Sequence, residues 1–196
     1  MYCGIILASG FSSRLGEDKL LLNFKGIPLL EHVLIAASRA SLDELILVYR
    51  KNRVKRLGEK YGCKVIHNSR ADQGQSEAVK AGLKAASAPC AGYLFMVSDQ
   101  PFLNETIIDK IINKHKETRA KIVMPLYGMS IESSIRGTPT LFSAELKSEI
   151  LSVKGDKGGR EIIEKYETSA VKILINYPQA AVDLDTWEDF NRWQDC

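Results

Sequence analysis

The feature that most constrains this chain is the regular alternation of strand-like and helix-like segments along almost its whole length. Mostly apolar runs predict strands at residues 3–8, 45–49, 64–67, 93–97, 121–124 and 171–175. Amphipathic patterns predict helices at residues 28–40, 52–60 and 76–87, and helices that begin near residues 104, 143, 160 and 187. Residues 125–139 look irregular. Strand–helix alternation at this pitch predicts an α/β fold with a mostly parallel central sheet and helices on both faces.

Length and composition narrow the class of protein. The chain has 196 residues, 45% of them hydrophobic and 26% charged, which suits one globular domain over residues 1–196. A net charge of +3 is too balanced to indicate a nucleic-acid partner. No apolar run reaches the roughly 18 residues of a membrane span, and the first apolar segment lacks secretory-signal features. We therefore expect a cytoplasmic protein without a membrane partner.

The cysteines and histidines show no metal-binding pattern. The four cysteines are far apart in sequence and form no CxxC motif, and they are Cys3, Cys63, Cys90 and Cys196. The three histidines show no ligand spacing. We expect reduced, mostly buried thiols and no zinc site.

The segment after the first predicted strand carries the residues best suited to bind phosphate. Small residues at 8–10 allow backbone N–H groups to approach a ligand closely. Ser12 and Ser13 add hydroxyl groups, Arg14 offers a planar guanidinium fork, and Lys19 offers a compact positive charge. The segment is neither a Walker A loop nor a GxGxxG motif. It predicts a polyphosphate-binding loop, and the alternative is a surface turn that happens to be basic.

Three aspartates are candidates for a metal site. Asp99 follows the fourth predicted strand, where the ligands of open parallel sheets bind. Asp183 and Asp185 alternate on an extended segment and are expected to point to the same side. Mg²⁺ prefers one or two carboxylates together with phosphate oxygens, so one of this pair is a candidate to complete a site with Asp99. The alternatives are that Asp99 caps a turn and that the other two acids are solvated.

Several segments match one family in the order in which they occur along the chain. They are residues 7–22, 74–77, 98–101, 136–139, 155–160 and 183–186. With these segments the chain resembles the MobA-like nucleotidyltransferases, and within them the molybdenum cofactor cytidylyltransferases (MocA-like). The resemblance implies a Rossmann-like three-layer sandwich. It also implies Mg²⁺-dependent transfer of CMP from CTP to molybdopterin, the molybdenum cofactor, with release of pyrophosphate, and a transient contact with a recipient molybdoenzyme.

The resemblance also implies roles for individual residues. The nucleotide would be held by Leu7, Ala8, Ser9, Gly10, Ser12, Ser13, Arg14 and Lys19, with Gln75 and Ser76 near the base or ribose. Arg14, Lys19 and Asp99 would be catalytic, and the metal would be bound by Asp99 with Asp183 or Asp185. The pterin would face Arg136, Gly137, Pro139, Asp156, Gly158, Gly159 and Arg160. Thr138 stands where the family more often has Asn or His, so the contacts to the acceptor substrate are expected to differ there.

Other functions remain open at this stage. Guanylyl-transferring relatives usually carry two glycines before the Ser/Arg segment, whereas residues 8–10 contain one, which favours CTP. Sugar- and polyol-phosphate nucleotidyltransferases belong to the same superfamily. A non-catalytic carrier or chaperone for the molybdenum cofactor is a further alternative. A hydride-transferring reductase is disfavoured because the GxGxxG motif and its acidic ribose partner are missing.

Overall fold

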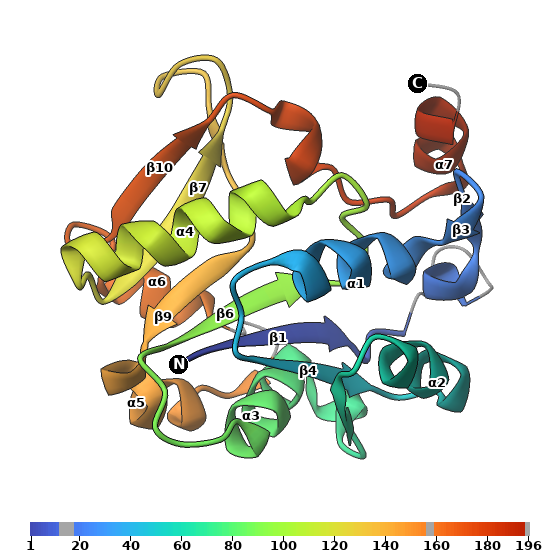
Figure 1. Ribbon diagram of the computed structural model, residues 1–196, viewed down its shortest axis with the longest axis horizontal. Coiled ribbons are helices and arrows are strands. Elements are labelled where there is room, and N and C mark those ends of the chain that lie inside the picture. Colours follow the sequence, from blue (N-terminus) through green and yellow to red (C-terminus); the bar gives the residue numbers. More distant parts are fainter. Residues whose placement is uncertain (12–17, 156–158, 195–196) are drawn as a thin grey trace.

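One mixed eight-stranded β-sheet forms the centre of the computed structural model, which describes residues 1–11, 18–155 and 159–194 (Figure 1). Its strands are β1 (Tyr2–Ala8), β4 (Glu44–Tyr49), β5 (Lys64–His67), β6 (Gly92–Val97), β7 (Ile122–Tyr127), β8 (Ile135–Arg136), β9 (Thr140–Ser143) and β10 (Val171–Ile175). They lie in the order β10-β7-β9-β6-β1-β4-β5, and β8 pairs with β7. All six predicted strands are present.

The sheet is mostly parallel, as predicted. β1 lies between β4 and β6 and is parallel to both, and its residue Leu7 is opposite Val48 and Val97. The carboxyl ends of these strands therefore meet at one edge of the sheet, and residues that follow them are brought together. β9 runs antiparallel to both β6 and β7 and joins the two parallel parts.

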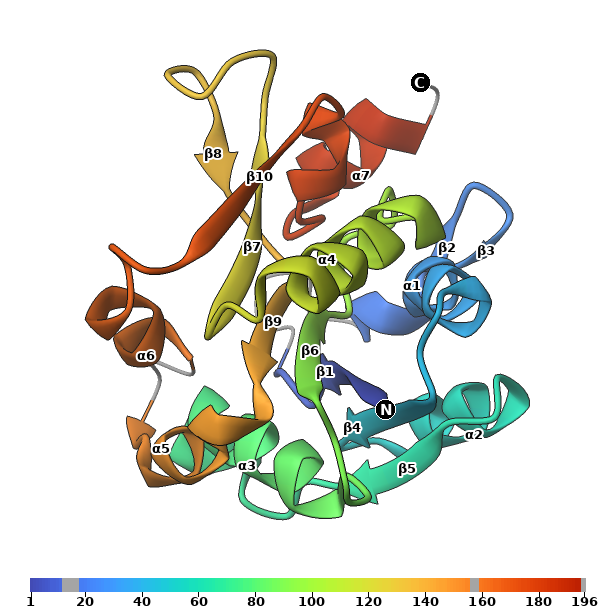
Figure 2. The ribbon, with the colours of Figure 1, turned by 60° about the vertical axis from the view of Figure 1, so that its left-hand side comes forward.

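Helices cover both faces of this sheet (Figures 1 and 2). One face carries α1 (Leu29–Arg39), α2 (Asn52–Lys60) and α4 (Glu105–Thr118), and the other carries α3 (Gln75–Ala85), α5 (Lys147–Ser152) and α6 (Arg160–Lys165). Successive residues of β1 point to opposite faces, so Ile6 packs with the first layer and Ile5 with the second, both fully buried. The three-layer sandwich is confirmed.

The structure corrects the prediction around residues 125–139. β7 continues to Tyr127, and residues 135–136 form β8, which pairs with it. Both residues of β8 are exposed, so no apolar pattern marks this strand in the sequence. A short hairpin of β2 (Asn23–Phe24) and β3 (Ile27–Pro28) also precedes α1, so Pro28 lies before that helix rather than within it.

The end of the chain is held by a third apolar cluster. α7 (Trp187–Gln194) begins at the predicted residue, after a capping box in which the Asp189 carboxylate accepts hydrogen bonds from the backbone and hydroxyl of Thr186. Phe190 of this helix packs with Leu184, Phe24 and Leu29. The cluster fixes the acidic segment before α7 against the hairpin and α1.

Two further expectations concern membranes and thiols. Among the described residues, no helix is long and apolar enough to cross a membrane. Cys3 and Cys63 are buried free thiols, and burial raises the pKa of the Cys63 thiol to about 12. Burial also raises the pKa of Cys3, and both thiols are therefore protonated and unreactive at neutral pH.

Candidate active site

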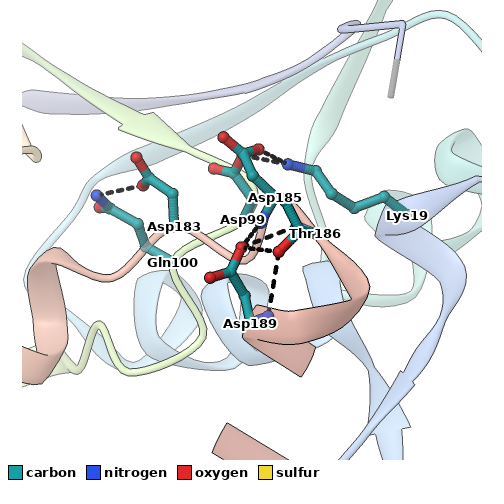
Figure 3. Close-up of polar contacts among 7 residues, drawn as sticks. All are labelled: Lys19, Asp99, Gln100, Asp183, Asp185, Thr186 and Asp189. Carbon is teal, nitrogen blue, oxygen red and sulfur yellow. Dashed lines mark hydrogen bonds and ion pairs between the residues drawn. The ribbon is translucent and has the colours of Figure 1, made fainter. Parts of the chain in front are cut away.

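Lys19 and two aspartates meet where β1 and β6 end (Figure 3). Lys19 begins the short 3-10 helix η1 (Lys19–Leu21), and Asp99 follows β6 after one residue. The Lys19 ammonium donates hydrogen bonds to Asp99 Oδ2 at 2.7 Å and to Asp185 Oδ1 at 2.6 Å. Parallel strands bring the first two residues together, whereas Asp185 arrives from a segment 166 positions away from Lys19.

This ion pair holds a positive charge in a largely enclosed position. The side chain of Lys19 is 9% exposed. Partial burial lowers the pKa of its ammonium, but the charges and hydrogen bonds of Asp99 and Asp185 outweigh that effect and the pKa is raised. Lys19 is therefore fully protonated at neutral pH and neutralises part of the acidic charge around it.

Asp183 is held by a different partner, Gln100. The Gln100 Nε2 donates to Asp183 Oδ1 at 2.9 Å. Partial desolvation by the surrounding protein atoms and then the charge of Asp99 raise the pKa of Asp183 to about 6, although its carboxyl group can be reached by solvent. Asp183 is thus the member of the acidic group whose charge is least well compensated by the described residues.

The backbone around Leu184 sets where the two acids point. The Leu184 N–H donates to the Asp99 carbonyl at 3.1 Å, and the Leu184 side chain is fully buried. Asp183 and Asp185 lie on either side of it in sequence; the Asp185 carboxylate lies beside that of Asp99 at Lys19, and the Asp183 carboxylate points to Gln100 (Figure 3). The Asp185 N–H is capped by Asp189 Oδ2 at 3.1 Å, which ties this acid to the start of α7.

The acids fit a divalent cation that arrives together with phosphate. Among the described residues, no three His, Cys, Asp or Glu side chains are grouped closely enough to hold a metal ion by themselves. Mg²⁺ is commonly held by one or two carboxylates and completed by phosphate oxygens and water. Asp99, Asp183 and Asp185 all supply carboxylates of this hard-oxygen type; Lys19 engages Asp99 and Asp185, whereas Gln100 engages Asp183.

The described part of the predicted phosphate loop is only partly open. Ala8 and Ser9 are buried, and Ser9 Oγ accepts a hydrogen bond from Asn68 Nδ2 at 3.0 Å. Gly10 is exposed, and a Cβ at this position would meet no described atom within 4 Å, so its backbone can be approached from solvent. Ser12, Ser13 and Arg14 lie outside the described residues.

Gln75 and Ser76 begin α3 next to this loop. Gly74, the residue before α3, has φ of 103°, a conformation that glycine adopts without strain. Ser76 is 1% exposed, and its Oγ has no hydrogen-bond partner among the described residues. Gln75 is exposed and lines the neighbouring pocket.

A pocket of about 380 Å³ opens beside Asp183 and extends between the sheet and the helices α3, α5 and α6. Apolar side chains form much of its wall, including Leu7, Val79, Phe95, Phe142, Ile150 and Ile163. Gln100, Thr138 and Asp183 form its polar end. The pocket therefore places an apolar chamber directly next to the acidic site.

Most of the residues predicted to face the acceptor line this pocket. They are Arg136, Gly137, Gly159 and Arg160. A Cβ on Gly137 would lie 2.8 Å from the Tyr127 ring, and this close approach explains the need for glycine. Pro139 is not among the lining residues, and Asp156 and Gly158 lie outside the described part of the chain. Arg136 donates to Glu167 at 3.1 Å across the exposed surface.

Two site residues received no role in the sequence analysis. Gln100 lies within a family-like segment, but nothing in its sequence neighbourhood reveals its partners Asp183 and Thr138. Asn68 follows the third predicted strand, and the rule that ligands bind after such strands could have singled it out. The aromatic wall at Phe95 and Phe142 is indistinguishable in sequence from an ordinary core.

An open, mostly parallel sheet with a lysine, acids and a pocket at its carboxyl edge is the arrangement in which α/β proteins of this class bind their ligands. The model of the MobA-like NTP transferase domain matches residues 4–171. The chain belongs to this family and is a nucleotidyltransferase.

Individual relatives cover nearly the whole chain. The purine catabolism protein PucB of Bacillus subtilis is 26% identical over 96% of this chain and 93% of its own length. A molybdenum cofactor guanylyltransferase of Ralstonia pickettii is 28% identical over 96% and 94%. The crystal structure of Rv0371c from Mycobacterium tuberculosis has a TM-score of 0.82 at 23% identity and covers 100% of this chain and 98% of that one. A manganese complex of Rv0371c has a TM-score of 0.80, also at 23% identity, and covers 99% and 98%.

Proposed function

We propose that this protein transfers CMP from CTP to the phosphate of molybdopterin, the molybdenum cofactor, and releases pyrophosphate in a Mg²⁺-dependent reaction. The observation that carries the proposal is the junction at Asp183, where the Lys19–Asp99 site meets an apolar pocket of about 380 Å³. One side offers charge for a triphosphate, and the other offers room for a ring system. The single glycine in residues 8–10 favours CTP as the donor.

The reaction needs no general base on the protein. The attacking atom is a phosphate oxygen of the acceptor, which is already anionic. It forms a bond to the α-phosphorus of CTP, the bond from that phosphorus to the bridging oxygen breaks, and the electron pair leaves with pyrophosphate. Such phosphoryl transfers depend mainly on positioning and charge stabilisation. The described site accordingly presents a lysine and carboxylates rather than a Ser–His pair.

Lys19 is suited to stabilise the leaving pyrophosphate. Its ammonium is protonated, and it is held between Asp99 and Asp185 until a triphosphate is present. A bound Mg²⁺ would neutralise phosphate charge and polarise the α-phosphate, with Asp99 and Asp183 as its protein ligands. Arg14 and the hydroxyl groups of Ser12 and Ser13 belong to the same proposed nucleotide site.

The pocket suits an acceptor with a flat ring and a phosphate. Phe95 and Phe142 supply apolar contact area, and Gln100 and Thr138 supply polar groups near Asp183. Arg136 and Arg160 lie on the same pocket and can meet anionic groups. A transient contact with a recipient molybdoenzyme belongs to this proposal, because the labile product must be delivered.

GTP is the second candidate donor, and a specific observation favours it. Several relatives that match the chain are named molybdenum cofactor guanylyltransferases, the Ralstonia pickettii protein among them. The names of these relatives favour GTP as the donor, whereas the single glycine in residues 8–10 favours CTP. A non-catalytic cofactor carrier is tested by the same experiment, and a sugar- or polyol-phosphate acceptor is tested by putting such a phosphate in place of molybdopterin.

The test is thermal unfolding with Mg²⁺ and each of CTP, GTP, ATP and UTP, followed by transfer to molybdopterin with detection of pyrophosphate. A ligand at about 100 times its Kd stabilises the folded state by roughly 2.7 kcal/mol, which is visible as a higher Tm. We expect the largest shift with CTP and its loss in Asp99→Asn. A preference for GTP would assign guanylyl transfer instead. Pyrophosphate release only with a sugar or polyol phosphate would assign that acceptor, binding without release with any acceptor would favour the carrier, and no shift with any nucleotide would refute the proposal.

A further inference from the structure

Gln100 is a buried polar side chain that joins three distant segments of the site. It is 4% exposed and follows Asp99 at the end of β6. Its Oε1 accepts a hydrogen bond from Thr138 Oγ1 at 2.6 Å, and its Nε2 donates to Asp183 Oδ1 at 2.9 Å. Thr138 comes from the connection between β8 and β9, and Asp183 from the segment before α7. Both partners line the pocket.

The two contacts select one orientation of the Gln100 amide. An ionised carboxylate only accepts hydrogen bonds, so the NH₂ group must face Asp183. The reversed amide would place its carbonyl oxygen against the Asp183 carboxylate, with two acceptors facing each other. The Thr138 hydroxyl can donate to the remaining carbonyl, which completes the chain Thr138–Gln100–Asp183. The amide is therefore locked from both ends.

The fixed Gln100 amide restricts the orientation of the Asp183 carboxylate. One of its oxygens is held by Gln100, so the carboxylate cannot rotate freely, and Figure 3 shows it directed to the Gln100 amide. The donated hydrogen bond also opposes the desolvation and the Asp99 charge that disfavour the ionised form. Loss of the Gln100 amide would leave Asp183 in the pocket without its described hydrogen-bond donor.

The connection to Thr138 is itself rigidly placed. The Tyr127 hydroxyl donates to the Thr138 carbonyl at 2.7 Å, and Tyr127 is 1% exposed. The backbone of the pocket wall is thus anchored to β7 independently of the Gln100 side chain. This second anchor offers a way to separate the integrity of the wall from the orientation of the acid.

We propose that Gln100 is a positioning residue: it orients the Asp183 carboxylate for the divalent cation and links that orientation to the Thr138 wall of the acceptor pocket. This inference rests on the proposed function, because it assigns Asp183 to the metal that accompanies the nucleotide. Hydrogen-bond partners that orient metal ligands typically change metal affinity or activity about 10–100-fold when they are removed.

The test compares Mn²⁺ binding to the wild-type protein and to Gln100→Met, which keeps the length of the side chain and removes both hydrogen bonds. Free Mn²⁺ is measured by electron paramagnetic resonance in the presence of α,β-methylene CTP, and kcat and KM are measured with CTP and molybdopterin. We expect the Kd for Mn²⁺ to rise about 10–100-fold in Gln100→Met. We also expect kcat at limiting Mg²⁺ to fall and to recover as the Mg²⁺ concentration is raised, a recovery that a smaller folded fraction would not show.

Matched variants separate positioning from packing. Thr138→Val removes one anchor of the amide and is expected to raise the Kd for Mn²⁺ less than Gln100→Met, whereas Thr138→Ser keeps the hydroxyl and is expected to restore wild-type binding. Tyr127→Phe removes the hydrogen bond to the wall and leaves the chain Thr138–Gln100–Asp183 intact, so its Mn²⁺ affinity should match that of the wild type. Circular dichroism and Tm establish that each variant is folded.

The outcomes are distinct. Wild-type Mn²⁺ affinity in folded Gln100→Met overturns the inference and leaves the proposed function standing. If Gln100→Met does not fold, Thr138→Val against Thr138→Ser decides the question, and equal Mn²⁺ affinities overturn the inference. Equal losses in Tyr127→Phe and Gln100→Met would assign the effect to the wall and also overturn it. A wild-type protein that binds neither Mn²⁺ nor any nucleotide would refute the proposed function, and the inference would fall with it.

Discussion

Polar side chains at the two ends of the sheet have different kinds of partner. At the amino end of β1, the Tyr2 hydroxyl lies 2.9 Å from His115 Nδ1 on α4, and the Tyr2 N–H donates to Asp43 Oδ2 at 2.6 Å. At the carboxyl end, Lys19 faces two acids, and Asp183 has a raised pKa of about 6. At the amino end these polar groups find their partners within the protein. The carboxyl end crowds like charges together, which costs stability unless a ligand or cation arrives.

The difference separates side chains that support folding from side chains that are open to a ligand. At the amino end, the Tyr2 hydroxyl and the His115 ring are buried and contact each other, so changes to them should affect folding. Acids at the carboxyl end keep some contact with solvent, since the side chains of Asp99 and Asp185 are 21% and 42% exposed. Changes there should affect activity more than folding, and the following predictions test that contrast.

The largest effect is expected for Lys19→Met at the carboxyl end. Loss of the ammonium removes stabilisation of the leaving pyrophosphate, and the transfer rate should fall about 10²–10³-fold, by analogy with the loss of an oxyanion-hole donor. The protein should stay folded because its acidic partners reach solvent. Removal of the competing cation should also strengthen Mn²⁺ binding in the absence of nucleotide, measured by electron paramagnetic resonance.

Lys165→Met is the matched control, because Lys165 forms an exposed ion pair with Glu149 at 2.6 Å on α6, outside the site. Its transfer rate and Mn²⁺ affinity should equal those of the wild type. A Lys19→Met protein that is folded and retains full activity would show that the carboxyl end is a structural ion pair like any other.

Leu184→Ala should lower both stability and activity, because this residue supports the site from within the apolar cluster. Its side chain is fully buried against Phe24 and Phe190, so truncation should lower the free energy of unfolding by about 2–5 kcal/mol. The activity should fall as well, since Asp183 and Asp185 flank this residue. Urea unfolding measures the first effect, and Leu174→Ala on the exposed edge of β10 should change stability by less than about 0.5 kcal/mol.

Two glycine variants sharpen the distinction between packing and binding. Gly137→Ala places a methyl group 2.8 Å from the Tyr127 ring, so we expect a loss of stability of about 1–3 kcal/mol and a higher KM for the acceptor. Gly10→Ala meets no described atom within 4 Å, so its Tm should be unchanged while its affinity for the nucleotide falls. Equal Tm losses in the two variants would contradict this assignment.

The smallest effect is expected from pH at the amino end. Burial, and then the charge of Arg119, lower the pKa of His115 below its ordinary value of 6.5. The unfolded chain therefore binds a proton at a higher pH than the folded protein does. The free energy of unfolding should fall as the pH drops below about 6.5, by at most about 1.4 kcal/mol per pH unit for one proton.

His115→Gln should remove this part of the pH dependence, as measured by urea unfolding between pH 5 and 8. An unchanged slope in the variant would mean that other groups cause it. The transfer rate at pH 7 should be the same in both proteins, because His115 lies at the end of the sheet opposite the site.

Sequence patterns predicted the central strands β1, β4 and β6 because buried parallel strands are continuous apolar runs, and they also found two edge strands. β5 and β10 begin and end at the predicted residues, and the Asn104 cap of α4 is present, with its side chain accepting from the Ile107 N–H at 3.1 Å. β8 was not foreseen because its two residues are exposed and pair with β7 only when that strand is already in place. The hairpin before α1 was missed because each of its strands has only two residues, too few to form a pattern.

The candidate site shows the same division. The positions of Lys19 and Asp99 after β1 and β6, together with the rule that ligands bind after parallel strands, are enough to single out both residues from the sequence. They do not reveal which of Asp183 and Asp185 contacts Lys19, because alternation places both on one side. The hydrogen bond from the Leu184 N–H to the Asp99 carbonyl fixes the position of this segment. In that position Asp185 contacts Lys19, and Asp183 contacts Gln100.

The sequence by itself determined the layered α/β fold, the family and the chemical types of group at the carboxyl edge, because apolar periodicity and loop motifs are local properties. Only the tertiary structure decided the pairing of Lys19 with Asp185, the chain Thr138–Gln100–Asp183 and the apolar pocket beside it. These contacts join residues 38 to 166 positions apart. Their geometry depends on how several segments pack together, and no local pattern in the sequence encodes it.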